Sequence, residues 1–196
     1  MENNNKNVSE KIRRSVWEWL ETIVISCLLV VFIFTFVFRI VGIDGDSMLN
    51  TLVDKERVII SDLFYTPSRG DIVVISRNYY NDIENKDNNS SPIIKRVIAT
   101  EGETVDIRDG HVFVNGEMLN EPYARTLTNP YASSDGVTFP VTVPENCVFV
   151  LGDNRGESWD SRSLSIGEDG MIDERYILGK ALFRIFPFQK FGGIYE

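Results

Sequence analysis

Hydrophobic residues are unevenly distributed along this chain: one long uninterrupted run is followed by many short runs separated by turn residues. Residues 22–38 (TIVISCLLVVFIFTFVF) contain no charged side chain over 17 positions. At about 1.5 Å per residue this run makes roughly 25 Å of helix, close to the lower limit for crossing a bilayer. Trp17 and Trp19 lie about one turn before it, where interfacial aromatic residues are common. The pattern predicts a single transmembrane helix.

Two other interpretations of this run fit it less well. A core helix of a soluble domain would show water a polar face, and this run has none. A cleaved signal peptide has an apolar region of about 7–15 residues that ends in small residues, whereas residues 37–39 are VFR. Lys11, Arg13 and Arg14 precede the run, which favours a cytoplasmic N-terminus and an exported remainder.

Beyond the predicted anchor the sequence is typical of a β protein. Asp109-Gly110 and Asn115-Gly116 are strong hairpin signals on either side of one short apolar run, and the polar, Asn-rich residues 78–91 predict a loop between two strands. Since no ten-residue stretch after residue 38 has a helical period, we expect a mainly β fold with a single N-terminal transmembrane helix followed by an all-β extracytoplasmic domain. The β-branched or aromatic runs that predict strands are residues 57–60, 71–75, 93–99, 111–114, 147–151 and 180–185.

A chain of 196 residues is long enough for one soluble domain and an anchor. We expect residues 1–40 to form the cytoplasmic N-terminus and the transmembrane anchor, and residues 41–196 to form the extracytoplasmic β-rich domain, with residues 104–146 approximately as a smaller inserted β region. The formal net charge of -9 argues against a nucleic-acid partner, because phosphate binding needs clustered Lys and Arg. With one histidine, His111, and no Cys/His cluster, we expect no catalytic metal and no cofactor.

Three separated segments contain side chains of the kind used in hydrolysis. Ser47 stands in a Gly-Asp-Ser-Met turn soon after the apolar run, Lys95 stands inside an apolar strand, and a polar stretch at residues 152–162 contains Ser158. Each has an ordinary explanation by itself, namely a turn serine, a lysine at a strand edge and a tight turn. Together, a serine and a lysine with Ile and Val neighbours are the two parts of a hydrolase that does not use histidine as its base.

In this order and behind a predicted anchor, the segments resemble the type I signal peptidases, which are membrane serine proteases with a Ser/Lys dyad. The resemblance covers nearly the whole chain and implies the β-rich fold of that family. Two departures leave the reacting groups in place: Asn50 stands where the family usually has proline, and ATEGE at 99–103 replaces the usual Gly-Leu-Pro-Gly-Asp. The segments similar to the family's motifs are SMLNTL at 47–52, GDIVV at 70–74, KRVI at 95–98 and GDNRGESWDSR at 152–162.

The resemblance implies a role for each candidate residue. Ser47 would be the nucleophile, Lys95 the general base, Ser158 the group that orients the Lys95 amine, and the Ser47 backbone N–H the oxyanion donor. Some family members carry a serine two residues before the nucleophile. This chain has Gly45 there, so that side-chain donor is missing and the role of Gly45 stays open. The charged residues that we expect to fix the surrounding loops are Arg96, as partner of Asp153, with Arg155, Asp160 and Arg162.

The apolar neighbours of Lys95 give the predicted base a physical rationale. A lysine at its ordinary pKa of about 10.4 is protonated at neutral pH and cannot accept a proton. Burial among Ile and Val disfavours the charged form. A base useful near pH 7–8 needs a pKa lower by roughly 3, or about 4 kcal/mol of differential desolvation.

The implied reaction is hydrolysis of one peptide bond after a small residue, through an acyl-enzyme on Ser47. Ser47 lies nine residues after Phe38, within roughly 30 Å of the end of the span even in an extended chain. The implied partners are therefore membrane lipid and exported precursor proteins that carry signal peptides, and the implied location is the cell membrane. Two alternatives remain. A repressor-type Ser/Lys autoprotease would carry a DNA-binding helical domain and no span, and a catalytically impaired, membrane-anchored β-domain would bind exported proteins without cutting them.

Overall fold

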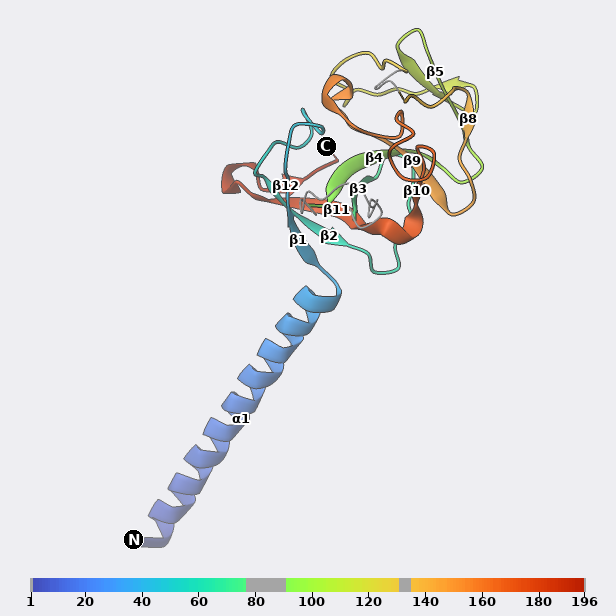
Figure 1. Ribbon diagram of the computed structural model, residues 1–196. Helices are drawn as coiled ribbons and strands as arrows, with labels where there is room; N and C mark the ends of the chain where they lie inside the picture. The colour runs from blue at the N-terminus through green and yellow to red at the C-terminus, as the bar shows by residue number, and fades with distance from the viewer. Residues whose placement is uncertain (1, 77–90, 131–134, 196) are drawn as a thin grey trace. The chain divides into compact units, whose positions relative to one another are not determined.

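A computed structural model describes residues 2–76, 91–130 and 135–195 of the chain (Figure 1). The loop predicted at residues 78–91 lies outside these ranges except for Ser91. The chain divides into two compact units, Met1–Arg39 and Ile40–Glu196.

The first unit is one long helix, α1 (Glu2–Phe36). Its segment Arg13–Thr35 is long and apolar enough to cross a membrane, and none of its most apolar window is buried against protein. Large hydrophobic side chains are exposed along it, as a lipid-facing helix requires. The predicted N-terminal apolar helix is confirmed. It begins well before residue 22, because the chain contains no glycine or proline before Gly42 that would interrupt a helix.

The regular secondary structure of the second unit is mostly strands, so the predicted mainly β fold is confirmed. Short 3-10 helices occur at η2 (Arg155–Glu157), η3 (Glu174–Tyr176) and η4 (Phe188–Lys190). The strands are β1 (Arg39–Gly42), β2 (Arg57–Ser61), β3 (Ile72–Ile75), β4 (Ile93–Thr100), β5 (Thr104–Arg108), β6 (His111–Val114), β7 (Glu117–Met118), β8 (Val141–Thr142), β9 (Cys147–Leu151), β10 (Ile172–Asp173), β11 (Ile177–Phe186) and β12 (Gly192–Gly193).

These strands form two sheets (Figure 1). The larger has the order β1-β2-β11-β3-β4-β9-β10, with β12 paired to β11, and the smaller has the order β7-β6-β5-β8. β11 pairs antiparallel with both β2 and β3, so a late strand lies between two early ones. Asn115 and Gly116 have φ of 53° and 84°, the left-handed conformation that an Asn-Gly hairpin turn needs. The hairpin predicted there connects β6 to β7.

β4 lies inside the larger sheet and is covered on both faces. Ile94 packs in one hydrophobic cluster, Ile98 in a second and Val97 in a third, and residues 94–99 are all buried. A strand buried on both faces has a continuous apolar sequence, which explains why its run lacks alternation. Its position carries Lys95 and Arg96 into the interior.

Candidate active site

Ser47 lies in the turn that links β1 to β2. Met48 and Leu52 are buried in the core beneath it, and the Leu52 amide donates to the Met48 carbonyl at 2.9 Å. These two anchors hold the turn while Ser47 stays partly exposed. Asn50, at the position where proline was expected, is exposed.

Lys95 reaches Ser47 from the middle of the sheet. It pairs with Val73 of the neighbouring strand, is 4% exposed, and places its Nζ 2.8 Å from Ser47 Oγ. The amine also donates to the Ile94 carbonyl at 3.1 Å. Burial disfavours a charged amine, so this environment suits a lysine that accepts a proton. The two groups that the sequence singled out are within hydrogen-bond distance although 48 residues separate them.

The turn at residues 152–155 follows β9 and supports the nucleophile. The Asn154 amide donates to the Ser47 carbonyl at 3.0 Å, and Asn154 Nδ2 donates to the Asp46 carbonyl at 3.1 Å. Gly152 passes so close to this site that a Cβ on it would lie 2.5 Å from the Ser47 carbonyl oxygen and 2.2 Å from Ser158 Oγ. Only glycine leaves room for the Ser47 and Ser158 segments to approach from two sides.

Ser158 therefore lies beside the dyad, across Gly152 from Ser47. Its Oγ is buried and makes no hydrogen bond with the part of the chain that the structure describes. The expected hydrogen bond from Ser158 to the Lys95 amine is not formed in this structure, and the orienting role of Ser158 stays a prediction. A buried hydroxyl without a partner costs free energy, which makes this group a candidate for contacts formed during the reaction.

Arg96, the residue after Lys95, joins β4 to the 152–155 turn. Its Nε and Nη2 donate to the two carboxylate oxygens of Asp153 at 2.8 and 2.7 Å, and its Nη1 donates to the Gly70 carbonyl at 2.9 Å. Thr51 Oγ1 also donates to Asp153, so the nucleophile turn is attached to the same carboxylate. Burial by itself would lower the pKa of Arg96, but the hydrogen bonds and charge of Asp153 outweigh it and raise the pKa overall.

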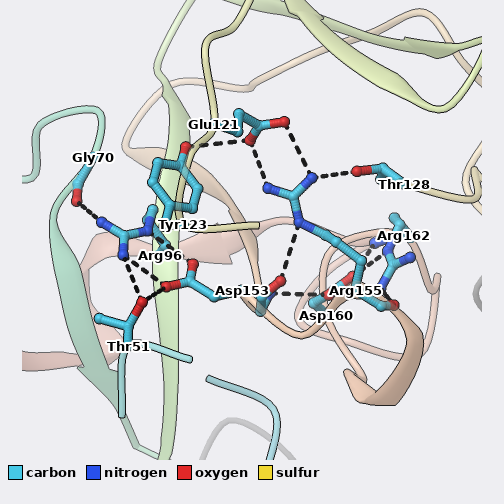
Figure 2. A network of polar contacts seen from close by, with 11 residues as sticks. Thr51, Gly70, Arg96, Glu121, Tyr123, Thr128, Asp153, Arg155, Asp160 and Arg162 are labelled. Carbon is cyan, nitrogen blue, oxygen red and sulfur yellow. Dashed lines mark hydrogen bonds and ion pairs between the residues drawn. The ribbon is translucent and has the colours of Figure 1, made fainter. Parts of the chain in front are cut away.

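Two further buried arginines hold the same loop (Figure 2). Arg155 Nε donates to the Gly152 carbonyl at 3.1 Å, and its Nη atoms pair with Glu121. Arg162 donates to Asp160 from Nε at 2.7 Å and from Nη2 at 2.9 Å. The Asp160 carboxylate in turn accepts the Gly152 amide at 3.1 Å. These contacts fix the backbone of the turn that supports Ser47.

The backbone amide of Ser47 is the predicted oxyanion donor, and this role stays a prediction. Among the residues that the structure describes, no hydrogen bond uses this amide as its donor, so it is available to a substrate oxygen. The Gly45 amide is different, because it donates to Asp54 Oδ1 at 3.1 Å. The backbone of Gly45 is thus occupied by a contact within the turn.

Several residues of this site gave no signal of their own in the sequence. Asn154 stands inside the quoted 152–162 stretch, but the ability of its amide to reach Asp46 depends on the fold. Glu121, Tyr123 and Thr128 lie between β7 and β8, more than 20 residues from any segment that they contact in the site. The one available signal was the pair of arginines in the 152–162 stretch, Arg155 and Arg162, which would need acidic or aromatic partners if they were buried.

No other part of the described chain offers a metal or base site. Across residues 2–76, 91–130 and 135–195 no group of three or more His, Cys, Asp or Glu side chains is placed to hold a metal ion. His111 is exposed in the smaller sheet, where it lines a cavity of about 600 Å³ formed mainly by residues 118–128. This cavity borders the Arg155 partners and not Ser47.

Comparison with known proteins identifies the family of the chain. Residues 16–186 match the family model described as signal peptidase, peptidase S26. Signal peptidase I S of Bacillus subtilis (strain 168) is 34% identical over 195 residues, which is 95% of this chain and 96% of the relative. Signal peptidase I of Bacillus licheniformis is 34% identical over 186 residues, 91% of this chain and 92% of the relative. The crystal structure of a signal peptidase I from Enterococcus faecalis V583 covers 59% of this chain and 97% of its own, at 30% identity and a TM-score of 0.45.

The chain belongs to the signal peptidase family, peptidase S26. It is a peptidase, and its long exposed apolar helix, together with the family, indicates a membrane-anchored protein.

Proposed function

We propose that Ser47 and Lys95 are the catalytic dyad with which this signal peptidase I removes signal peptides from exported precursor proteins. The observation that carries the proposal is the 2.8 Å distance between Lys95 Nζ and Ser47 Oγ. It is within the reach that proton transfer between a nucleophile and its base requires. The same contact favours an active enzyme over an anchored domain that binds exported proteins without cutting them.

The reaction proceeds in two halves. The neutral Lys95 amine accepts the Ser47 proton while Oγ attacks the carbonyl carbon, and the tetrahedral oxyanion accepts a hydrogen bond from the Ser47 amide. The ammonium then protonates the leaving amine, the peptide bond breaks, and the signal peptide stays as an ester on Ser47. A water attacks this ester with Lys95 again as base, which releases the acid and restores the serine.

Ser158 and the charged residues have supporting roles in this proposal. The Ser158 hydroxyl is buried without a partner beside Gly152, near the Ser47 carbonyl, and in this proposal it bonds to the Lys95 amine during the reaction and aims it. Arg96, Asp153, Asp160 and Arg162 are positioning residues, because their recorded contacts are with each other, with backbone, and with the side chains of Thr51 and Tyr123.

The cleavage takes place at the membrane surface. Helix α1 is anchored in lipid with its N-terminus in the cytoplasm, and Lys11, Arg13 and Arg14 set this orientation. The second unit, Ile40–Glu196, then faces the extracytoplasmic side. There it meets precursors still held by their apolar signal segments, and it cuts after a small residue.

The test uses the full chain in detergent and a precursor whose new N-terminus is sequenced after cleavage. Ser47→Ala and Lys95→Ala should each lower the rate by several orders of magnitude while the protein stays folded, because members of one catalytic unit fail together. Lys55→Gln is the matched control, because Lys55 is an exposed lysine just before β2, and this variant should cleave normally. Wild-type cleavage by either dyad variant would overturn the proposal.

A further inference from the structure

Glu121 and Tyr123, one residue apart and outside the dyad, contact two buried arginines (Figure 2). We call residues 121–123 the strap. Glu121 accepts hydrogen bonds from Nη1 and Nη2 of Arg155 at 3.2 and 2.5 Å. The ring of Tyr123 lies under the Arg96 guanidinium, whose Cζ is 3.9 Å from the ring centroid, and the Tyr123 hydroxyl donates to Glu121 at 3.2 Å. The strap is thus one unit with two attachments.

One of the two arginines is in the strand that carries Lys95, and the other is in the turn that supports Ser47. Arg96 follows Lys95 in β4, and Arg155 closes the turn whose Asn154 amide holds the Ser47 carbonyl. The Arg96–Asp153 ion pair joins the same two segments directly. The strap therefore bridges the strand that carries the base and the turn that supports the nucleophile, from the connection that follows the smaller sheet's β7.

Both attachments are strong for a physical reason. Arg96 is 6% and Arg155 is 3% exposed, and a guanidinium this deeply buried needs charged or aromatic partners in fixed places. Burial also raises the pKa of Tyr123, so its hydroxyl keeps the proton that it donates to Glu121. The Arg125 amide, two residues after Tyr123, donates to the Asp153 carbonyl at 2.9 Å and adds a backbone contact to the same turn.

We infer that Tyr123 and Glu121 are positioning residues for peptide-bond cleavage, acting through Arg96 and Arg155 to keep the Lys95 amine at Ser47 Oγ. This inference rests on the proposed function. Neither residue contacts the dyad atoms, so the strap acts on the geometry of the chemical step and leaves substrate binding to other surfaces. Its loss should lower kcat and leave KM nearly unchanged.

Tyr123→Leu is the decisive variant, because it keeps apolar volume, removes the ring face, and leaves the Arg96–Asp153 ion pair intact. We expect kcat per folded molecule to fall by about tenfold or more, with KM within about twofold of wild type. Tyr123→Phe keeps the ring and loses only one hydrogen bond, so it should retain most of the activity. Phe113→Leu is the matched control, since Phe113 is stacked on Arg108 at 4.2 Å in the smaller sheet.

The experiment measures kcat and KM on a precursor peptide with the full chain in detergent, together with the folded fraction and melting temperature from circular dichroism. A wild-type kcat in folded Tyr123→Leu overturns the inference. So does an equal loss of kcat in Phe113→Leu at an equal drop in melting temperature, because the effect would then be general destabilisation. Ser47→Ala is measured in the same assay. If this variant stays active, both the proposed dyad and the inference about the strap are wrong. If it is inactive, the result for Tyr123→Leu tests the inference about the strap separately.

Discussion

Gly152→Ala tests the geometry of the site with a single added methyl group. The new Cβ would lie 2.5 Å from the Ser47 carbonyl oxygen and 2.2 Å from Ser158 Oγ. The φ of Gly152 is not in the left-handed region, so alanine brings steric pressure there and no backbone strain of its own. The Ser158 hydroxyl can rotate away, but the Ser158 Cβ at 2.6 Å and the Ser47 carbonyl oxygen move only with their backbone segments.

The size of the effect follows from these distances. An ordinary van der Waals contact of a Cβ begins at 3.4 Å, so the Ser47 carbonyl must move by about 0.9 Å. Misplacement of a reacting group by about 1 Å costs about 100-fold in rate, which corresponds to roughly 2.7 kcal/mol of transition-state stabilisation. We therefore expect kcat to fall about 100-fold in Gly152→Ala.

The assay is cleavage of a precursor peptide by the full chain in detergent, with the melting temperature measured on the same preparation. Gly156→Ala is the control from the same loop, because a Cβ at Gly156 would meet nothing within 4 Å. It should cleave at the wild-type rate. If Gly152→Ala cleaves within about threefold of wild type, Gly152 does not separate Ser47 from Ser158 in the working enzyme, and the described geometry of the turn is refuted.

Three more predictions concern the buried ion pair, the base and the topology. Arg96→Met should destabilise the second unit by about 3–5 kcal/mol in chemical denaturation, because it leaves the buried Asp153 carboxylate without its cation, whereas Arg175→Met at an exposed pair should change little. Cleavage should increase as pH rises from about 6, since only the unprotonated Lys95 amine can accept the serine proton. His111→Ala should leave this pH profile unchanged, and loss of the profile in that variant would transfer the role of base to histidine. Protease added to intact cells should digest the second unit, and full protection until the membrane is opened would mean that the proposed orientation is wrong.

In the larger sheet, local sequence patterns predicted the interior strands better than the edge strands. The continuous run at 93–99 became β4, and the Asn115-Gly116 turn closed the hairpin that it predicts. β5 was missed because its alternation rests on only two buried residues, Val105 and Ile107. The insertion of β11 between β2 and β3 has no local signal, since strand pairing across more than 100 residues is decided by the whole core.

The residues of the candidate site could also be predicted only in part. Ser47 and Lys95 could be singled out because they occur together, in this order and behind an apolar run, in segments that resemble the motifs of one family, although each alone has an ordinary explanation. Asn154, Glu121 and Tyr123 could not, because each is an ordinary loop residue until folding brings its partner within reach. The hydrogen bond expected from Ser158 is not formed, and no sequence pattern specifies the side-chain geometry on which it depends.

The place of β11 in the larger sheet bears on when the enzyme becomes active during its own synthesis. β2 and β3 emerge early, but they are not joined until β11, near residue 180, arrives between them. Lys95 is on β4, which pairs with β3, so the strand that presents the base has an incomplete sheet beside it until then. A growing chain therefore contains Ser47 and Lys95 long before the sheet that carries Lys95 can be completed. We expect no cleavage by a nascent chain that has not yet made β11.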